Sequence, residues 1–93
     1  MRVLIVEDET AAYENLADII TSVNSGIRIA GNTESVTQTV HWLQSNPSPD
    51  LIFMDIHLSD GSAFAIFDKI TVETPIVFTT AYAQYAIEAS RVN

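Results

Sequence analysis

Short apolar runs alternate with longer amphipathic segments along the whole chain. Four runs have the length and the β-branched content of strands, and they begin near Val3, Ile27, Leu51 and Ile76. Three of the four are apolar at every position, which is typical of strands that are buried on both faces of a parallel sheet. The run at Ile27 alternates in part, so we expect a less buried edge strand over residues 27–31.

The first two segments between the runs have the apolar period of helices. In the segment 10–23 the apolar side chains recur at spacings of three and four, at Ala12, Leu16, Ile19, Ile20 and Val23. We expect a left-handed cap at Gly26 beyond the end of this helix. A capping-box pattern from Ser35 to Gln38 starts the second helix, and the prolines after Asn46 end it.

The sequence after the third run predicts a turn, a third helix, a strand and a fourth helix. Asp60-Gly61 is a turn pattern, and we interpret Asp60 simply as a turn residue. The inner stripe of the third helix, which we expect to face the core, consists of Ala63, Phe64, Phe67 and Ile70. Beyond the strand at Ile76, residues 81–92 fit a fourth helix.

This alternation of strand and helix predicts an α/β fold with a doubly wound parallel sheet and right-handed crossovers. A length of 93 residues allows one domain at most, with a modest core. The run Ile76-Val77-Phe78 is apolar on both faces, which is a poor composition for an exposed sheet edge. We therefore expect residues 1–93 to be a domain that is incomplete at its C-terminal end, without a fifth strand and a fifth helix.

Composition narrows the classes of partner. The chain has 12 acidic and 4 basic residues and a formal net charge of -8, which disfavours nucleic acid and anionic membranes as ligands and favours cations. It has no cysteine, which excludes disulfides, thiolate metal sites and thiol catalysis. No apolar stretch approaches the roughly 18–20 residues of a membrane span. We expect a cytoplasmic protein.

Carboxylates follow two of the apolar runs directly. Glu7, Asp8 and Glu9 come after the first run, and Asp55 ends the third. If these two strands are neighbours, about 4.8 Å apart, Asp8 and Asp55 converge at the carboxyl edge of the sheet. Two carboxylates with waters and carbonyl oxygens suit Mg²⁺, and an ionised Asp beside Mg²⁺ is a competent nucleophile toward a phosphoryl group. The alternative is that these acids are solvated loop residues.

Three blocks of the sequence together resemble the signature of a known family. Residues 3–9, 50–56 and 75–82 are similar, in order and in separation, to the signature blocks of response regulator receiver domains. The resemblance covers the entire chain and implies the flavodoxin-like receiver fold, with strand order 2-1-3-4 for the four strands present. Residues 58–61 and 78–89 most resemble the LytTR-type subgroup, whose regulators usually carry a DNA-binding output domain after the receiver.

The resemblance implies a role for each matching residue. Asp55 would accept the phosphoryl group of a histidine kinase's phosphohistidine. Asp8 and Asp55 would bind Mg²⁺ directly, Glu7 would bind it through water, and the backbone carbonyl of His57 would be a further ligand. Thr80 would be the switch hydroxyl, which hydrogen-bonds the phosphoryl group and draws the following loop inward.

The resemblance leaves some assignments open. Thr79 is the rival of Thr80 for the switch hydroxyl, one residue away. Receivers commonly dimerise through the region after this position, so Tyr82, Tyr85 and Ile87 are candidate contacts of a homodimer or another self-association. The alternative for the two tyrosines is partial burial against a neighbouring element. Trp42 is better explained by ordinary packing than by a binding role.

The chain also departs from the family pattern. The family carries a lysine followed by proline after its fifth strand and an aromatic switch residue three positions before that lysine, and this sequence ends at Asn93 before either. Lys69 belongs to the third predicted helix and is no substitute. Ser59 stands where many receivers have proline.

These features predict a phosphorylation-controlled signalling module of a two-component system rather than an enzyme, with self-phosphorylation and self-dephosphorylation as its only reactions. Its partners would be a histidine kinase and an output domain in the same protein. One alternative is an interaction module that works without phosphorylation. The other is an aspartate-nucleophile phosphohydrolase, although such enzymes typically carry a second Asp two residues after the nucleophile, where this chain has His57.

Overall fold

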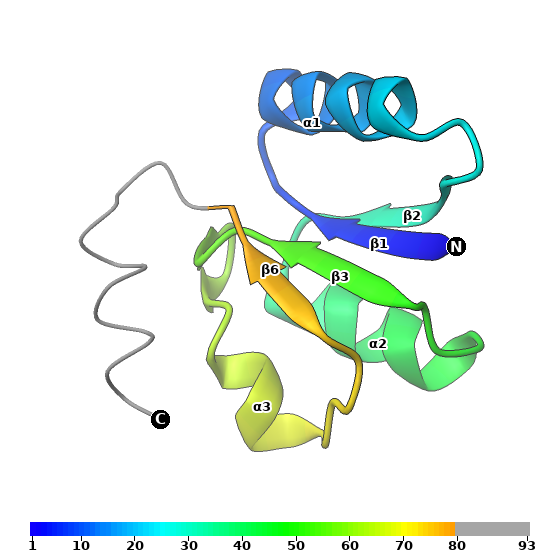
Figure 1. Ribbon diagram of the computed structural model, residues 1–93. Helices are drawn as coiled ribbons and strands as arrows, with labels where there is room; N and C mark the ends of the chain where they lie inside the picture. Colours follow the sequence, from blue (N-terminus) through cyan, green and yellow to red (C-terminus); the bar gives the residue numbers. More distant parts are fainter. Residues whose placement is uncertain (80–93) are drawn as a thin grey trace.

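A parallel sheet with helices on both faces organises the chain (Figure 1). The computed structural model describes residues 1–79, so the expected fourth helix and Thr80, Tyr82, Tyr85 and Ile87 lie outside the described residues. The sheet has the order β2-β1-β3-β6 and consists of β1 (Arg2–Val6), β2 (Arg28–Thr33), β3 (Leu51–Met54) and β6 (Ile76–Phe78). Because β6 is the fourth predicted strand, this confirms the order 2-1-3-4 and the parallel pairing.

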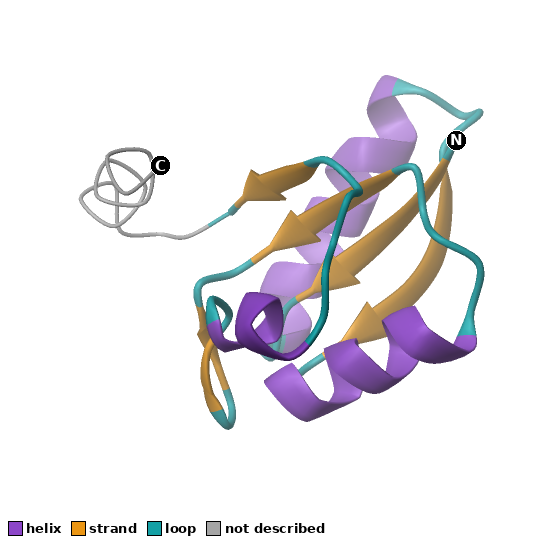
Figure 2. Ribbon diagram, turned by 90° about the horizontal axis from the view of Figure 1, so that it is seen from below, coloured by secondary structure: helices purple, strands orange, loops and turns teal. Residues whose placement is uncertain are grey.

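Three helices and a short hairpin complete the described part. They are α1 (Thr10–Val23), α2 (Val36–Ser45), α3 (Ala65–Lys69) and the antiparallel pair β4 (His57–Leu58) and β5 (Gly61–Ser62). α1 covers one face of the sheet, and α2 and α3 cover the other (Figures 1 and 2). This arrangement is the doubly wound fold that the alternating pattern predicts.

The main core lies between the sheet and the α2–α3 layer. Alternate side chains of β1 and β3 point to this side and are buried, and with the helical and loop residues they form one cluster of Leu4, Val6, Val36, Ile52, Met54, Leu58, Ala63 and Ile66. The intervening positions Val3 and Ile5 are equally buried on the α1 side. Strands apolar on both faces are thus explained by a sheet covered on both faces.

The α1 face is less completely covered by the described residues. Of the predicted apolar stripe of α1, Ile20 is buried, whereas Ile19 and Val23 are 52% and 79% exposed. The described elements therefore pack against only part of this stripe. The predicted left-handed cap at Gly26 is wrong, since Gly61 is the one residue with a positive φ in residues 1–79. The helix instead ends at Asn24 in extended backbone.

The third helix is shorter than its pattern predicts. Residues Gly61–Ser62 form β5 instead, so α3 has five residues and begins at Ala65. Ala63 and Ile66 are buried, whereas Phe64 and Phe67 are 41% and 37% exposed. Their assignment to the core is therefore wrong: Phe64 precedes the five-residue helix, and within the helix Ile66 rather than Phe67 is buried against the core. The ring centroids of Phe64 and Phe67 lie 6.4 Å apart.

The edge strands of the sheet, among the described residues, are β2, as predicted, and β6. β2 is one edge and continues to Thr33, two residues beyond the predicted end, after a bulge where Leu4 pairs with Gly31. Among the described strands β6 is the other edge, and Val77 is 45% exposed there. Within residues 1–79 no helix is long and apolar enough to cross a membrane.

Substitution of Gly31 tests directly how Trp42 packs. A Cβ atom at Gly31 would lie 2.7 Å from the indole Nε1 of Trp42, which packs half-buried against the core as expected. We predict that Gly31→Ala lowers the free energy of unfolding by about 1–3 kcal/mol and changes the Trp42 fluorescence, because the ring must move. Urea denaturation followed by fluorescence measures both effects. Gly26→Ala is the control, since its Cβ meets only the exposed Asn24 side chain at 3.1 Å; equal stability of the two variants would contradict the prediction.

Candidate functional site

The pairing of β1 with β3 brings two carboxylate segments to the same edge of the sheet. Val6 pairs with Met54, so Glu7 and Asp55 are the next residues along two neighbouring strands. The backbone N–H of Asp55 donates to the carbonyl of Val6 at 2.9 Å, which continues the pairing by one step. On the other side of β1, the N–H of Glu7 donates to the carbonyl of Thr33 at 2.9 Å. Backbone hydrogen bonds therefore set the positions of both acids.

Three carboxylates converge at this edge. Oxygen atoms of Glu7, Asp8 and Asp55 all lie within 4.8 Å of one another. Glu7 is buried, and Asp8 and Asp55 are half-buried. This confirms the expected convergence of the first and third strands, and it rules out three independent, fully solvated loop acids. A cluster of carboxylate oxygens that remains partly open to water fits a hard divalent cation such as Mg²⁺.

The electrostatics of Glu7 reflect this crowding. Burial is the largest cause that raises the pKa of Glu7, and the neighbouring carboxylates of Asp55 and Asp8 raise it further. The backbone N–H of Glu9, which donates to Glu7 Oε2 at 3.1 Å, acts in the opposite direction. A cation bound to the cluster would neutralise this repulsion and let the carboxylates stay ionised together.

Residues at the end of β2 hold the backbone of Glu7 in place, a contribution that the sequence pattern did not indicate. The side-chain amide of Asn32 donates to the carbonyls of Ile5 and Glu7 at 3.0 and 3.2 Å. Thr33, which accepts the Glu7 N–H, is buried, and its hydroxyl lies 2.7 Å from that of Thr39 in α2. The predicted strand ended at Gly31, whereas β2 continues to Thr33 and so brings Asn32 and Thr33 to the site.

The segment after Asp55 passes directly into the β4–β5 hairpin. Its first residue, His57, is exposed and pairs with Ser62, while Ile56 and Leu58 on either side are buried. The backbone position of His57, two residues after Asp55, is therefore set by the β4–β5 pairing and by its two buried neighbours. Thr79, the described candidate for the switch hydroxyl, is half-buried after β6, and its N–H donates to the carbonyl of Met54 at 2.9 Å.

Asp60 has a larger role than the turn residue that the sequence suggested. Its carboxylate accepts from the N–H groups of Val36 and Thr37 and from the Thr37 hydroxyl, at the first turn of α2. These hydrogen bonds, that of Val36 first, hold the pKa of Asp60 below its usual value. The same turn is capped internally, because Ser35 Oγ accepts from the N–H of Gln38 at 3.0 Å as the capping-box pattern predicts.

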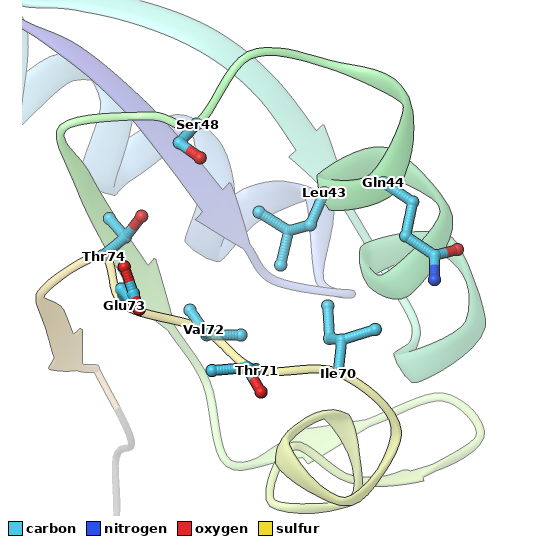
Figure 3. Close-up of a pocket in the computed structure, with 8 residues that line it drawn as sticks. All are labelled: Leu43, Gln44, Ser48, Ile70, Thr71, Val72, Glu73 and Thr74. Atoms are coloured by element: carbon cyan, nitrogen blue, oxygen red, sulfur yellow. The ribbon is translucent and has the colours of Figure 1, made fainter.

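A shallow pocket of about 130 Å³ lies at the opposite end of the strands (Figure 3). Its lining comes from the end of α2, the segment before β3 and the segment before β6: Leu43, Gln44, Ser48, Ile70, Thr71, Val72, Glu73 and Thr74. Glu73 is its one charged side chain. It lacks the convergent polar groups of the carboxyl edge, so the acidic cluster remains the candidate site.

The three carboxylates stand at the ends of β1 and β3 on a sheet of order 2-1-3-4, and the sequence around them matches a family model. The model described as response regulator receiver domain matches residues 3–93. The chain belongs to this family. A receiver domain is a signalling module of two-component systems rather than a metabolic enzyme.

Relatives and solved structures agree with this family. The receiver domain is 40% identical over its whole length to the sensory transduction protein LytT of Enterococcus faecalis, of which it covers 39%. It is 33% identical, again over its whole length, to the transcriptional regulatory protein LytR of Staphylococcus aureus, of which it covers 38%. The crystal structure of the response regulatory domain of mrkE from Klebsiella pneumoniae is 33% identical, with a TM-score of 0.80 over 99% of this chain and 76% of that one.

These comparisons confirm the predicted family and its LytTR-type subgroup. They also confirm the flavodoxin-like receiver fold. The receiver domain spans less than two fifths of the LytT and LytR relatives, so the activity and partners of a whole protein that contains it are matters for proposal.

The raised pKa of Glu7 predicts a pH-dependent stability in the absence of divalent cations. An acid whose pKa is higher in the folded than in the unfolded state binds more protons when folded, so stability falls as pH rises from the unfolded value through the raised one. At pH values above the raised pKa, Glu7 is ionised in both the folded and the unfolded state, and its destabilising contribution is complete. We predict that Glu7→Gln stabilises the protein at neutral pH and removes this decline, as measured by urea denaturation across pH 4–8 with a chelator present.

Glu9→Gln is the matched control for this experiment. Glu9 is exposed, and its contribution to Glu7 comes from its backbone N–H, which the substitution keeps. We expect a change in unfolding free energy within about 0.5 kcal/mol, as is usual for surface substitutions. Destabilisation of the protein by Glu7→Gln at neutral pH would show that Glu7 is not under electrostatic strain.

Proposed function

We propose that Asp55 is the phosphoacceptor of this receiver domain and that it takes its phosphoryl group from a phosphohistidine of a histidine kinase. The observation that carries the proposal is the cluster of Glu7, Asp8 and Asp55, whose carboxylate oxygens lie within 4.8 Å of one another at the carboxyl edge of the sheet. Clusters of this kind on solvent-accessible strand ends suit metal-assisted phosphoryl transfer, in which positioning and charge stabilisation supply most of the catalysis.

The proposed reaction is one displacement at phosphorus. An Asp55 oxygen forms a bond to phosphorus as the bond between phosphorus and the imidazole nitrogen of the phosphohistidine breaks. The electron pair of that bond stays on the imidazole, and the product on Asp55 is an acyl phosphate. Asp55 is suited to this role because it is half-buried yet reachable, and its backbone N–H bond to Val6 holds it in place.

The donor set around Asp55 fits Mg²⁺, which would neutralise charge on the transferring phosphoryl oxygens when bound. Asp8 and Asp55 would be its direct protein ligands, with the backbone carbonyl of His57 as a third. Glu7 would act through water, in keeping with its greater burial than that of Asp8 and Asp55. Self-phosphorylation by small phosphodonors and self-dephosphorylation would use the same groups.

The readout of phosphorylation is proposed to begin at Thr80, whose hydroxyl would bind the phosphoryl group. The surface that includes Tyr82, Tyr85 and Ile87 would then change its pairing with a second copy or with a DNA-binding output domain in the same protein. Such a change is a population shift, driven by contacts that differ between two states. We propose a cytoplasmic setting, with the histidine kinase as partner and no direct nucleic-acid contact by residues 1–93.

The alternatives gain no specific support. A phosphohydrolase would need an acid two residues after its nucleophile, and His57 occupies that position. The convergence of the buried Glu7 with the half-buried Asp8 and Asp55 favours a phosphoacceptor over a module that works without phosphorylation, since dispersed acids would serve the latter equally well.

Substitution of the phosphoacceptor tests the proposal. With acetyl phosphate and Mg²⁺, we expect intact-mass spectrometry to show the addition of one phosphoryl group to the wild type and none to Asp55→Asn, because the amide is not a nucleophile toward phosphorus. Asp68→Asn is the control, as Asp68 is an exposed acid of α3. Phosphorylation of Asp55→Asn at the wild-type level, or none in the wild type, would refute the assignment.

The switch assignment has its own test. We predict that Thr80→Ala is still phosphorylated but loses most of the NMR shift changes that a beryllofluoride mimic causes at residues 82–87. Thr79→Ala should keep these changes, because the contact of Thr79 with Met54 uses its backbone N–H. The reverse result would make Thr79 the switch hydroxyl.

A further inference from the structure

The β4–β5 hairpin is tied to the start of α2 by Asp60, and we infer that Asp60 is a positioning residue for the proposed metal ligand on His57. This inference rests on the function proposed above, because it concerns the backbone of His57, whose carbonyl is there proposed as a metal ligand. Asp60 itself lies too far along the hairpin turn to be counted among the cluster of Glu7, Asp8 and Asp55. Its effect would be exerted through the backbone of the hairpin.

Asp60 uses both of its carboxylate oxygens in this contact. Oδ1 accepts from the N–H of Val36 at 2.6 Å, and Oδ2 accepts from the N–H and the hydroxyl of Thr37 at 3.1 and 3.0 Å. Three bonds to a rigid helical turn define the orientation of the carboxylate as well as its distance. The negative charge also lies at the positive end of the α2 dipole, which strengthens the contact.

A second contact reinforces the tie. Ser59 donates to the carbonyl of Glu34 from its N–H at 3.4 Å and from its hydroxyl at 3.2 Å. Two consecutive residues of the hairpin turn are thus attached to the segment 34–37, which links β2 to α2. The position of the turn relative to the end of β2 is therefore determined by several bonds rather than by one.

The last residue of β2, directly before this segment, also holds Glu7 in place. Thr33, which precedes Glu34, accepts the N–H of Glu7, and the N–H of Asp55 donates to Val6. These hydrogen bonds connect the end of β1 to the end of β2, the segment 34–37 to the hairpin turn, and the end of β3 back to β1. His57 lies between Asp55 and the tie at Asp60, so loss of the tie would remove one of the restraints that orient its carbonyl, while the buried Ile56 and Leu58 keep β4 in place.

The hairpin does not need Asp60 in order to fold. Ile56 and Leu58 are 3% and 8% exposed and anchor β4 in the core, and β4 pairs with β5 on its own. Asp60→Ala is therefore expected to change the orientation and order of the hairpin turn while the sheet and helices remain. This property separates a positioning role from a general loss of structure.

A purely structural role is the competing explanation, since Asp60 also satisfies N–H groups of the first turn of α2. Ser35→Ala supplies the matched control. It removes the bond from Gln38 N–H to Ser35 Oγ and so weakens the same helix turn, but it leaves the hairpin attached through Asp60 and Ser59. Asp60→Asn keeps an acceptor oxygen and serves as the conservative variant.

The experiment is a Mg²⁺ titration of the full chain and of the three variants, followed by NMR and combined with thermal melts. In Asp60→Ala we expect Mg²⁺ affinity to fall about tenfold, the lower end of the loss caused by removing an outer-shell partner. Asp60→Asn should fall between this variant and the wild type. Ser35→Ala should lower the melting temperature but keep wild-type Mg²⁺ affinity. The Leu58 amide, which shares a peptide group with the His57 carbonyl, should respond to Mg²⁺ in the wild type and much less in Asp60→Ala.

The outcomes separate this inference from the function on which it rests. Wild-type Mg²⁺ affinity in a folded Asp60→Ala, or losses in Asp60→Ala and Ser35→Ala that simply follow their melting temperatures, would overturn the positioning role alone. A metal-free spectrum in which the Val36 and Thr37 amides do not shift in Asp60→Ala would overturn the tie itself. A wild-type protein that binds no Mg²⁺ and gains no phosphoryl group on Asp55 would overturn the proposed function as well.

Discussion

The pairing of Val6 with Met54 is the constraint on which the rest of the site depends. It places the first residues beyond β1 and β3 side by side, and the bond from Asp55 N–H to the Val6 carbonyl holds them there. Carboxylates this close repel one another, and burial of Glu7 adds to the cost. The apolar burial of β1 and β3, which are covered on both faces of the sheet, offsets this repulsion.

The polar framework around the acids comes from outside the two strands that carry them. Asn32 and Thr33 hold the backbone of Glu7 from β2, and Ser59 and Asp60 attach the hairpin to the start of α2. None of these side chains is a candidate nucleophile. They fix the backbone of Glu7 and the hairpin that follows Asp55, and a metal or phosphoryl site needs such support because its residues must be held in place before the ligand arrives.

Much of this molecule could be read from the order of its residues. Strand positions, the three described helices, the cap at Ser35 and the acids at strand ends all follow from patterns within a few residues of each other, which the chain expresses whatever surrounds it. The neighbouring places of the first and third strands were implied by the family resemblance alone, and the sheet order confirms them.

The predictions that failed concern residues whose environment depends on contacts between segments far apart in the chain. Phe64 and Phe67 have helical spacing but are partly exposed, because α3 begins only after Phe64 and packs Ile66 rather than Phe67 against the core. Asp60 looked like a turn residue, since nothing near it in sequence shows that the first turn of α2 lies within its reach. Local patterns thus determine which residues enter strands, helices and strand ends. Which polar groups meet across the fold, and so which of them can support the acidic site, is decided by packing between segments far apart in the chain.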